Sequence, residues 1–135
     1  MSRRDTVYDN FKIVTNNPLV KTKLGEEYHV EYSDVSYEDI IKKVRDDIYV
    51  GYQLLSHPLS GSVKPNETPY KSIMLAREET TLDLQSVEII ENVLQTIPKF
   101  TFRSDKYKPE VYEDFQLIDF TLIDSAIPSA TRWQK

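Results

Sequence analysis

The spacing of hydrophobic and polar positions predicts a chain in which short strands alternate with helices. Strands are expected in four segments rich in β-branched, aromatic or alternating apolar residues: 11–15, 28–32, 52–56 and 70–76. Asn16-Asn17-Pro18 stops the first strand and opens a short helix through Leu24, because proline suits the first position of a helix. Helical patterns also follow the second and the fourth strand, as described next.

Two longer helices are expected where apolar residues recur every three or four positions. Ser36 and Asp39 form a capping box, in which each side chain satisfies a free backbone donor near the other. Asp83 or Thr81 caps the second helix, and Pro98 limits it. The apolar stripes are Ile40, Ile41, Val44 and Ile48 in the first helix, and Leu84, Val87, Ile90, Val93 and Ile97 in the second.

This alternation is typical of an α/β domain. With 135 residues the chain has the length of one domain, so we expect a single α/β domain over residues 1–135, with loose terminal segments at 1–10 and 124–135. We expect a mainly parallel sheet of about four strands with helices on both faces, and an antiparallel fourth strand fits the pattern too. Residues 111–123 fit either a helix face or a strand buried on both sides.

Composition and charge exclude several classes of function. The chain has 17 Lys and Arg against 22 Asp and Glu, and its net charge of -5 is the wrong sign for binding nucleic acid through phosphates. It has no cysteine, which excludes disulfides, thiolate nucleophiles and electron transfer on sulfur through this chain. No stretch approaches the roughly 20 apolar residues that span a bilayer, and no apolar signal core follows the first residues. We therefore expect a cytoplasmic protein that binds neither nucleic acid nor membrane.

The sequence gives little support for a bound metal ion or cofactor, and we expect neither. Two distant histidines without an H-E-x-x-H motif leave only Asp34, Asp39 and Glu67 as candidate metal ligands. The three glycines form neither a G-x-G-x-x-G fingerprint nor a nucleotide phosphate loop. Conventional dinucleotide binding and ATP or GTP hydrolysis are therefore disfavoured.

Polar residues follow three of the four predicted strands. In open α/β sheets, ligands bind beyond the carboxyl ends of the strands, so these residues are expected to line one crevice. The candidate ligand-binding residues are Thr15, Asn16 and Asn17 after the first strand, Ser33 and Asp34 after the second, and Ser56 and His57 after the third.

The segment 57–69 is the most unusual local sequence of the chain. Three prolines stiffen it, and loops of this length without regular structure are often functional. Ser60-Gly61-Ser62 and Lys64 are suited to an anion, because glycine lets backbone N–H groups turn inward while hydroxyls and an ammonium add donors. An ordinary Ser/Gly turn with a solvated lysine is the alternative. The remaining candidates of this region are Asn66, Glu67 and Tyr70, whose hydroxyl closes the loop.

His57 is the candidate acid or base. A histidine at a strand end beside hydroxyls can exchange a proton near neutral pH, although it can equally anchor its own loop through backbone hydrogen bonds. A serine hydrolase is disfavoured, because Ser56 and His57 are adjacent and point apart in a strand, and no G-x-S-x-G elbow is present. His29, in the middle of a predicted strand, is expected to be a sheet residue.

Two segments carry a family resemblance: Val14-Thr15-Asn16-Asn17-Pro18-Leu19-Val20, and residues 55–72 with the sequence LSHPLSGSVKPNETPYKS. They resemble the GrdX family, small proteins encoded beside the selenium-dependent glycine, sarcosine and betaine reductases of amino-acid-fermenting anaerobic bacteria. The resemblance implies a cytoplasmic accessory of a reductase that converts glycine to acetyl phosphate and ammonia by selenol and thiol chemistry. It assigns no catalytic residue.

The lack of cysteine shapes the functional hypotheses, because this chain cannot join a thiol relay. The first hypothesis is a non-catalytic accessory that binds a glycine or betaine reductase component, or a small anionic metabolite, at the strand-end crevice and the 57–69 loop. The alternatives are a small enzyme that acts on an acyl phosphate or amino-acid derivative with His57 as acid and base, and a structural oligomer subunit. The sequence leaves the oligomeric state open.

Overall fold

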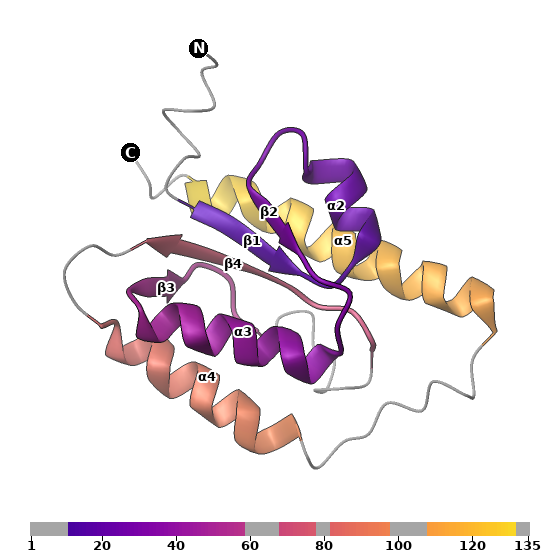
Figure 1. Cartoon of the computed structure of the whole chain (residues 1–135). Coiled ribbons are helices and arrows are strands. Elements are labelled where there is room, and N and C mark those ends of the chain that lie inside the picture. The colour runs from indigo at the N-terminus through magenta and orange to yellow at the C-terminus, as the bar shows by residue number, and fades with distance from the viewer. Residues whose placement is uncertain (1–10, 59–67, 78–81, 98–107, 132–135) are drawn as a thin grey trace.

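A computed structural model describes residues 11–58, 68–77, 82–97 and 108–131 of the chain. Figure 1 shows a sheet flanked by helices. The described elements are, in chain order, β1 (Phe11–Thr15), α2 (Pro18–Leu24), β2 (Val30–Tyr32), α3 (Tyr37–Tyr49), β3 (Tyr52–Leu54), β4 (Ser72–Arg77), α4 (Leu84–Thr96) and α5 (Pro109–Thr131). The α/β class predicted from the sequence is confirmed.

The sheet is mixed, so the prediction of a mainly parallel sheet is wrong. Its strands lie in the order β2-β1-β4-β3. β1 and β2 are parallel, whereas β4 is antiparallel to both β1 and β3. Parallel neighbours need a crossover connection, which α2 supplies between β1 and β2. No helix is described between β3 and β4, and these two strands pair as an antiparallel ribbon.

The ends of the helices follow local sequence rules. The Asn17 side chain accepts a hydrogen bond from the backbone N–H of Leu19 at the start of α2. At the start of α3, the Ser36 hydroxyl accepts from the N–H of Asp39 at 3.1 Å. Asp83 caps α4. These three helix starts were predicted correctly from the sequence.

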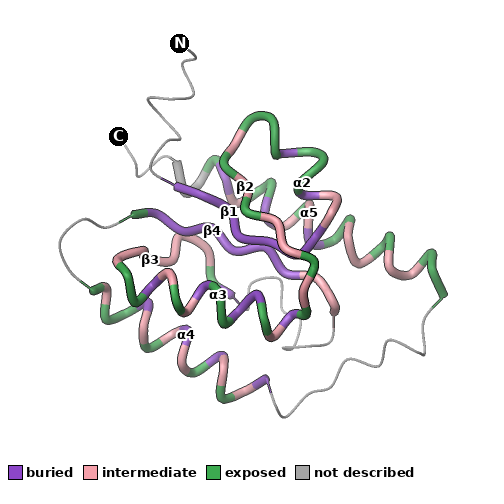
Figure 2. Tube along the Cα trace, viewed as in Figure 1, coloured by how far each residue is buried: buried purple, intermediate pink, exposed green. Residues whose placement is uncertain are grey.

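Two core clusters share the strands β1 and β4, because alternate residues of a strand point to opposite faces of a sheet. Figure 2 shows both strands buried along most of their length. The first cluster joins Val14, Ile73 and Leu75 of the sheet to Ile40, Ile41, Val44 and Ile48 of α3 and to Ile90 and Val93 of α4. The second joins Phe11, Ile13, Met74 and Ala76 to Val20 and Leu24 of α2 and to Ile123 and Ile127 of α5.

Residues 111–123, for which the sequence left helix and strand open, are part of α5, and this helix continues to Thr131. The prediction of a loose segment from residue 124 is therefore wrong for 124–131, because the buried Ile127 anchors that part of the helix in the second core cluster. The predicted loose residues 1–10, and 132–135, lie outside the described residues. No described helix has the length and apolar character that crossing a membrane requires.

Candidate functional site

The candidate site lies where the end of β1 meets the beginning of β4. Because these strands are antiparallel, Thr15 pairs with Ser72, and the residues just before β4 lie beside those just after β1. Ser33, which follows β2, donates its backbone N–H to the carbonyl oxygen of Thr15 at 3.0 Å. The ends of β1 and β2 therefore lie together, as predicted, and the start of β4 joins them.

A chain of hydroxyl groups connects this end of the sheet to α5. The Ser72 Oγ donates to Asp119 Oδ2 at 2.6 Å and lies 2.7 Å from Thr15 Oγ1. A serine hydroxyl has one proton, so Thr15 is the donor to Ser72. Thr15 Oγ1 in turn accepts from the backbone N–H of Asn17 at 2.9 Å. The direction of each hydrogen bond in the chain is thus fixed, and it ends on the Asp119 carboxylate.

Asp119 is the buried anion of the site, with 6% of its surface exposed. Its carboxylate also accepts from the backbone N–H of Ser72 and from Asn17 Nδ2, both at 3.0 Å. Three donors compensate the loss of hydration that burial imposes on a carboxylate. Asp119 was missed from the sequence, although an acidic residue between the apolar Phe115 and Leu122 on one helix face is a signal.

Asn16 and Asn17, predicted to bind ligand, make hydrogen bonds within the protein. Asn16 Nδ2 donates to the carbonyl oxygens of Val35 and Pro69, at 2.9 and 2.8 Å. Its Oδ1 accepts from the backbone N–H of Lys71 at 2.9 Å. The two amide side chains thereby connect the end of β1 to the segments that lead into α3 and β4 and to α5.

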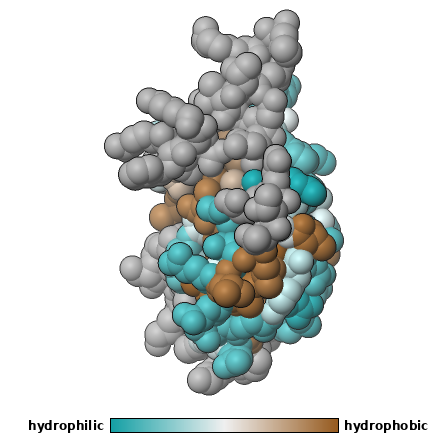
Figure 3. Space-filling model, turned by 90° about the vertical axis from the view of Figure 1, so that its left-hand side faces the viewer, coloured by the Kyte–Doolittle hydropathy of each residue, from teal (hydrophilic) through white to brown (hydrophobic). Residues whose placement is uncertain are grey.

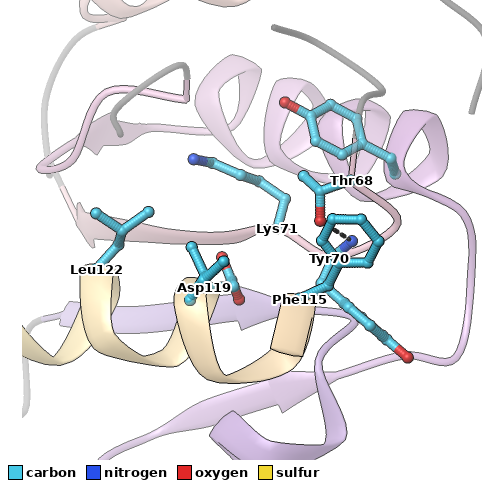
Figure 4. Close-up of a pocket in the computed structure, with 8 residues that line it drawn as sticks. Thr68, Tyr70, Lys71, Phe115, Asp119 and Leu122 are labelled. Atoms are coloured by element: carbon cyan, nitrogen blue, oxygen red, sulfur yellow. Dashed lines mark hydrogen bonds between the residues drawn. The ribbon is translucent and has the colours of Figure 1, made fainter. Parts of the chain in front are cut away.

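A pocket opens beside this network, between α5, the start of α3 and the chain that leads into β4. Its volume is about 70 Å³, enough for a small organic group. Figure 4 shows Asp119 and Leu122 on α5 facing Lys71, which directly precedes β4. The polar side chains that line it are Tyr37, Thr68, Tyr70, Lys71 and Asp119.

Three side chains of α5 form the apolar wall of the pocket: Phe115, Ile118 and Leu122. Ile118 is 53% exposed and so forms part of the rim. Tyr70 is held against α5 by Gln116, whose Nε2 donates to the tyrosine hydroxyl at 3.0 Å. The pocket therefore combines a small number of polar groups with an apolar wall, which is the usual composition of a small-molecule site.

Two titratable groups of the pocket have shifted pKa values. Burial lowers the pKa of Lys71 below its ordinary value, and the negative charge of Asp119 opposes that shift. Burial raises the pKa of the Tyr37 hydroxyl to about 12, and the charge of Asp119 raises it further in the same direction. At neutral pH the Tyr37 hydroxyl is consequently protonated and serves as a hydrogen-bond donor.

The structure separates the other predicted residues from the pocket. The Ser56 hydroxyl accepts from the backbone N–H of Met74 at 2.9 Å, and His57 is exposed and does not line the pocket. Asp34 and Asp39 are exposed, and the described residues contain no group of three or more potential metal ligands. The remaining candidates lie outside the described residues: Ser60, Gly61, Ser62, Lys64, Asn66 and Glu67.

Among the residues that the structure describes, large exposed apolar side chains lie in two places. One is α5, where Leu117 is 55% exposed beside Ile118 on the pocket rim. The other is the side of the molecule drawn in Figure 3, where the end of α3 and the start of α4 meet and hydrophobic patches alternate with hydrophilic residues. Val50 and Leu84 are exposed at these two helix ends.

Comparison with known protein families identifies a match over most of the chain. A family model described as GrdX-like protein matches residues 12–128, a span that contains every residue lining the pocket. Comparison with curated proteins gave no match, and neither did comparison with solved structures.

Proposed function

This chain belongs to the GrdX-like protein family, and from that premise we propose that it is a non-catalytic accessory protein of selenium-dependent glycine, sarcosine and betaine reductase systems. Its role in them is to bind a small anionic metabolite. The binding site is the pocket between α5 and the chain that leads into β4. Tyr70 is the one described residue predicted from the sequence to bind a ligand that lines this pocket, whereas the predicted residues after β1 and β2 do not line it.

The observation that carries the proposal is a buried lysine in a pocket with an apolar wall. Lys71 is 6% exposed, and it lines the pocket together with Phe115 and Leu122. An ammonium group removed from water attracts an anion more strongly than an exposed one, because the surroundings screen the charges less. A small anion that enters the pocket would face this charge.

The hydroxyl groups near the pocket support binding in preference to catalysis. Ser72 and Thr15 are buried, and their hydrogen bonds connect them to Asp119 and to the backbone of Asn17. Neither hydroxyl contacts a histidine that would activate it as a nucleophile. The chain also has no cysteine with which to take part in thiol chemistry.

A protein partner is the second candidate, and the exposed apolar side chains of α5 favour it. Leu117 and Ile118 are adjacent and more than half exposed, at 55% and 53%. Apolar groups gathered at one place on a surface often mark a contact with another protein. The partner in this case would be a component of the glycine or betaine reductase.

The test is a thermal-shift screen of wild type, Lys71→Met and a control variant, Lys43→Met, in which an exposed lysine of α3 is replaced. The ligands are phosphate, acetyl phosphate, glycine, sarcosine and betaine. A ligand at about 100 times its dissociation constant stabilises the fold by roughly 2.7 kcal/mol. We expect a shift in wild type and Lys43→Met that is lost in Lys71→Met. No shift with any ligand contradicts the metabolite site and favours the protein partner.

A further inference from the structure

The Tyr37 hydroxyl is a buried polar group for which the described part of the chain provides no hydrogen-bond partner. The side chain is 4% exposed and lines the pocket. Among the residues that the structure describes, none forms a hydrogen bond with this hydroxyl. Native proteins seldom leave a buried hydroxyl without a hydrogen bond, so an unpaired one in a pocket wall points to a ligand.

The state of the hydroxyl determines what the ligand must offer. The pKa of Tyr37 is about 12 because of burial and the nearby charge of Asp119. The phenol therefore keeps its proton at neutral pH and donates it to a hydrogen-bond acceptor. Lys71 also lines the pocket and has only donors, so two donor side chains line the same pocket.

A carboxylate suits this pair better than a phosphate group. It has two oxygens and one negative charge, whereas a phosphate has three terminal oxygens and close to two charges at neutral pH. The like charge of Asp119, which also lines the pocket, disfavours a second negative charge on the ligand. The apolar side chains of α5 suit a short hydrocarbon chain attached to the carboxylate.

We propose that the pocket binds a small monocarboxylate, whose oxygens accept hydrogen bonds from Tyr37 Oη and Lys71 Nζ while its carbon chain packs against Phe115 and Leu122. This inference rests on the proposed function and names the chemical class of its ligand. The charge of Lys71 distinguishes a carboxylate from an uncharged group of the same shape, and Tyr37 adds a hydrogen bond to one of its oxygens.

The experiment is an NMR chemical-shift titration with propionate, its uncharged isostere propionamide, and inorganic phosphate. The proteins are wild type, Tyr37→Phe and Tyr49→Phe. Tyr49 is the matched control, because it lies at the opposite end of α3, is exposed, and bonds to Glu91. We expect wild type and Tyr49→Phe to bind propionate and not propionamide. Loss of a hydrogen bond to a charged group weakens binding about tenfold or more, which is the effect expected for Tyr37→Phe.

A second readout separates recognition from a structural role. Because the hydroxyl has no hydrogen-bond partner among the described residues, Tyr37→Phe should unfold at the same temperature as wild type or at a higher one. Propionate should then raise the unfolding temperature of wild type more than that of the variant. A hydroxyl with a structural role would instead give a variant that is less stable without ligand, and that result contradicts the proposal.

The outcomes distinguish failure of this inference from failure of the proposed function. If propionate binds wild type and Tyr37→Phe equally, or propionamide binds as well as propionate, the inference is wrong. It is also wrong if phosphate shifts the pocket signals of wild type while propionate does not bind, although the anion site would then stand. If none of the probes binds wild type, the inference and the proposed metabolite site both fail.

Discussion

The side-chain amide of Asn17 lies 3.0 Å from the carboxylate of Asp119, which is 102 residues further along the chain. The same amide caps α2 through its Oδ1, which accepts from the backbone N–H of Leu19 at 3.0 Å. One residue therefore fixes the start of α2 and orients the acidic group of α5. The position of α5 in turn places the apolar wall of the pocket.

Asp119→Asn tests whether this carboxylate anchors α5. The substitution keeps the size of the side chain but turns an acceptor oxygen into a donor that faces Ser72 or Asn17. We expect a loss of unfolding free energy of about 3 kcal/mol, because hydrogen bonds to a charged group are lost and buried donors remain unpaired. Urea denaturation measures it, and Asp124→Asn, an exposed site on the same helix, is the control. Equal stability of both variants would contradict the anchoring role.

The Tyr37 hydroxyl predicts a pH dependence of stability. Its pKa rises from 10.0 in the unfolded chain to about 12 in the folded protein. Between these values the unfolded state has lost the proton and the folded state has kept it, so stability is present below pH 10 and falls as the pH rises to 12. Linkage gives a loss of about 3 kcal/mol across that window.

Tyr37→Phe removes this contribution and leaves the other tyrosines in place. We expect the stability of the variant to fall less steeply than that of wild type between pH 10 and pH 12, as measured by denaturant unfolding. Parallel curves for the two proteins would show that Tyr37 does not titrate with the raised pKa that its burial implies.

Lys12 of β1 forms ion pairs with one acidic residue of β2 and one of α3. Its Nζ lies 3.1 Å from both Glu31 Oε1 and Asp47 Oδ2, and 4.2 Å from the centre of the Tyr52 ring. Lys12→Met should reduce the unfolding free energy by about 2 kcal/mol, less than for a fully buried pair because both carboxylates have access to water. Adding Asp47→Leu should recover part of the loss. A double variant that loses the sum of the two single effects would contradict this coupling.

The second candidate function predicts an effect of Leu117→Glu. The side chain is exposed, so the change should alter the unfolding free energy by no more than about 0.5 kcal/mol. It should also reduce recovery of a reductase component with the tagged protein from an anaerobic extract. Leu84→Glu, at an exposed site on α4, is the control. Equal recovery of the component with both variants would contradict the proposal that it docks on α5.

The sequence predicted the features that depend on neighbours along the chain. Asn17-Pro18, Ser36 with Asp39, and Asp83 start their helices as expected, because a cap needs only groups within one helical turn. The apolar stripe of α3 forms the first core cluster for the same reason. Periodicity and capping are local properties, and they were sufficient for these elements.

Features that depend on distant contacts could not be predicted from the sequence. The direction of β4 follows from its pairing with β1, and the extent of α5 follows from the packing of Ile127 in the second core cluster. The bonds of Asp119 to Asn17 and Ser72 join segments that no local pattern connects. No local pattern marks Tyr37, and only the structure shows that its hydroxyl lines a pocket without a hydrogen bond to another described residue.

The most direct test of the anion site is an NMR titration of wild type that follows the lysine side-chain signals as small anions are added. Binding in the pocket should shift the Lys71 signal with a saturating dependence on concentration and leave the exposed Lys43 unchanged. Shifts of similar size at both lysines, or no shift at Lys71, would contradict a metabolite site in this pocket.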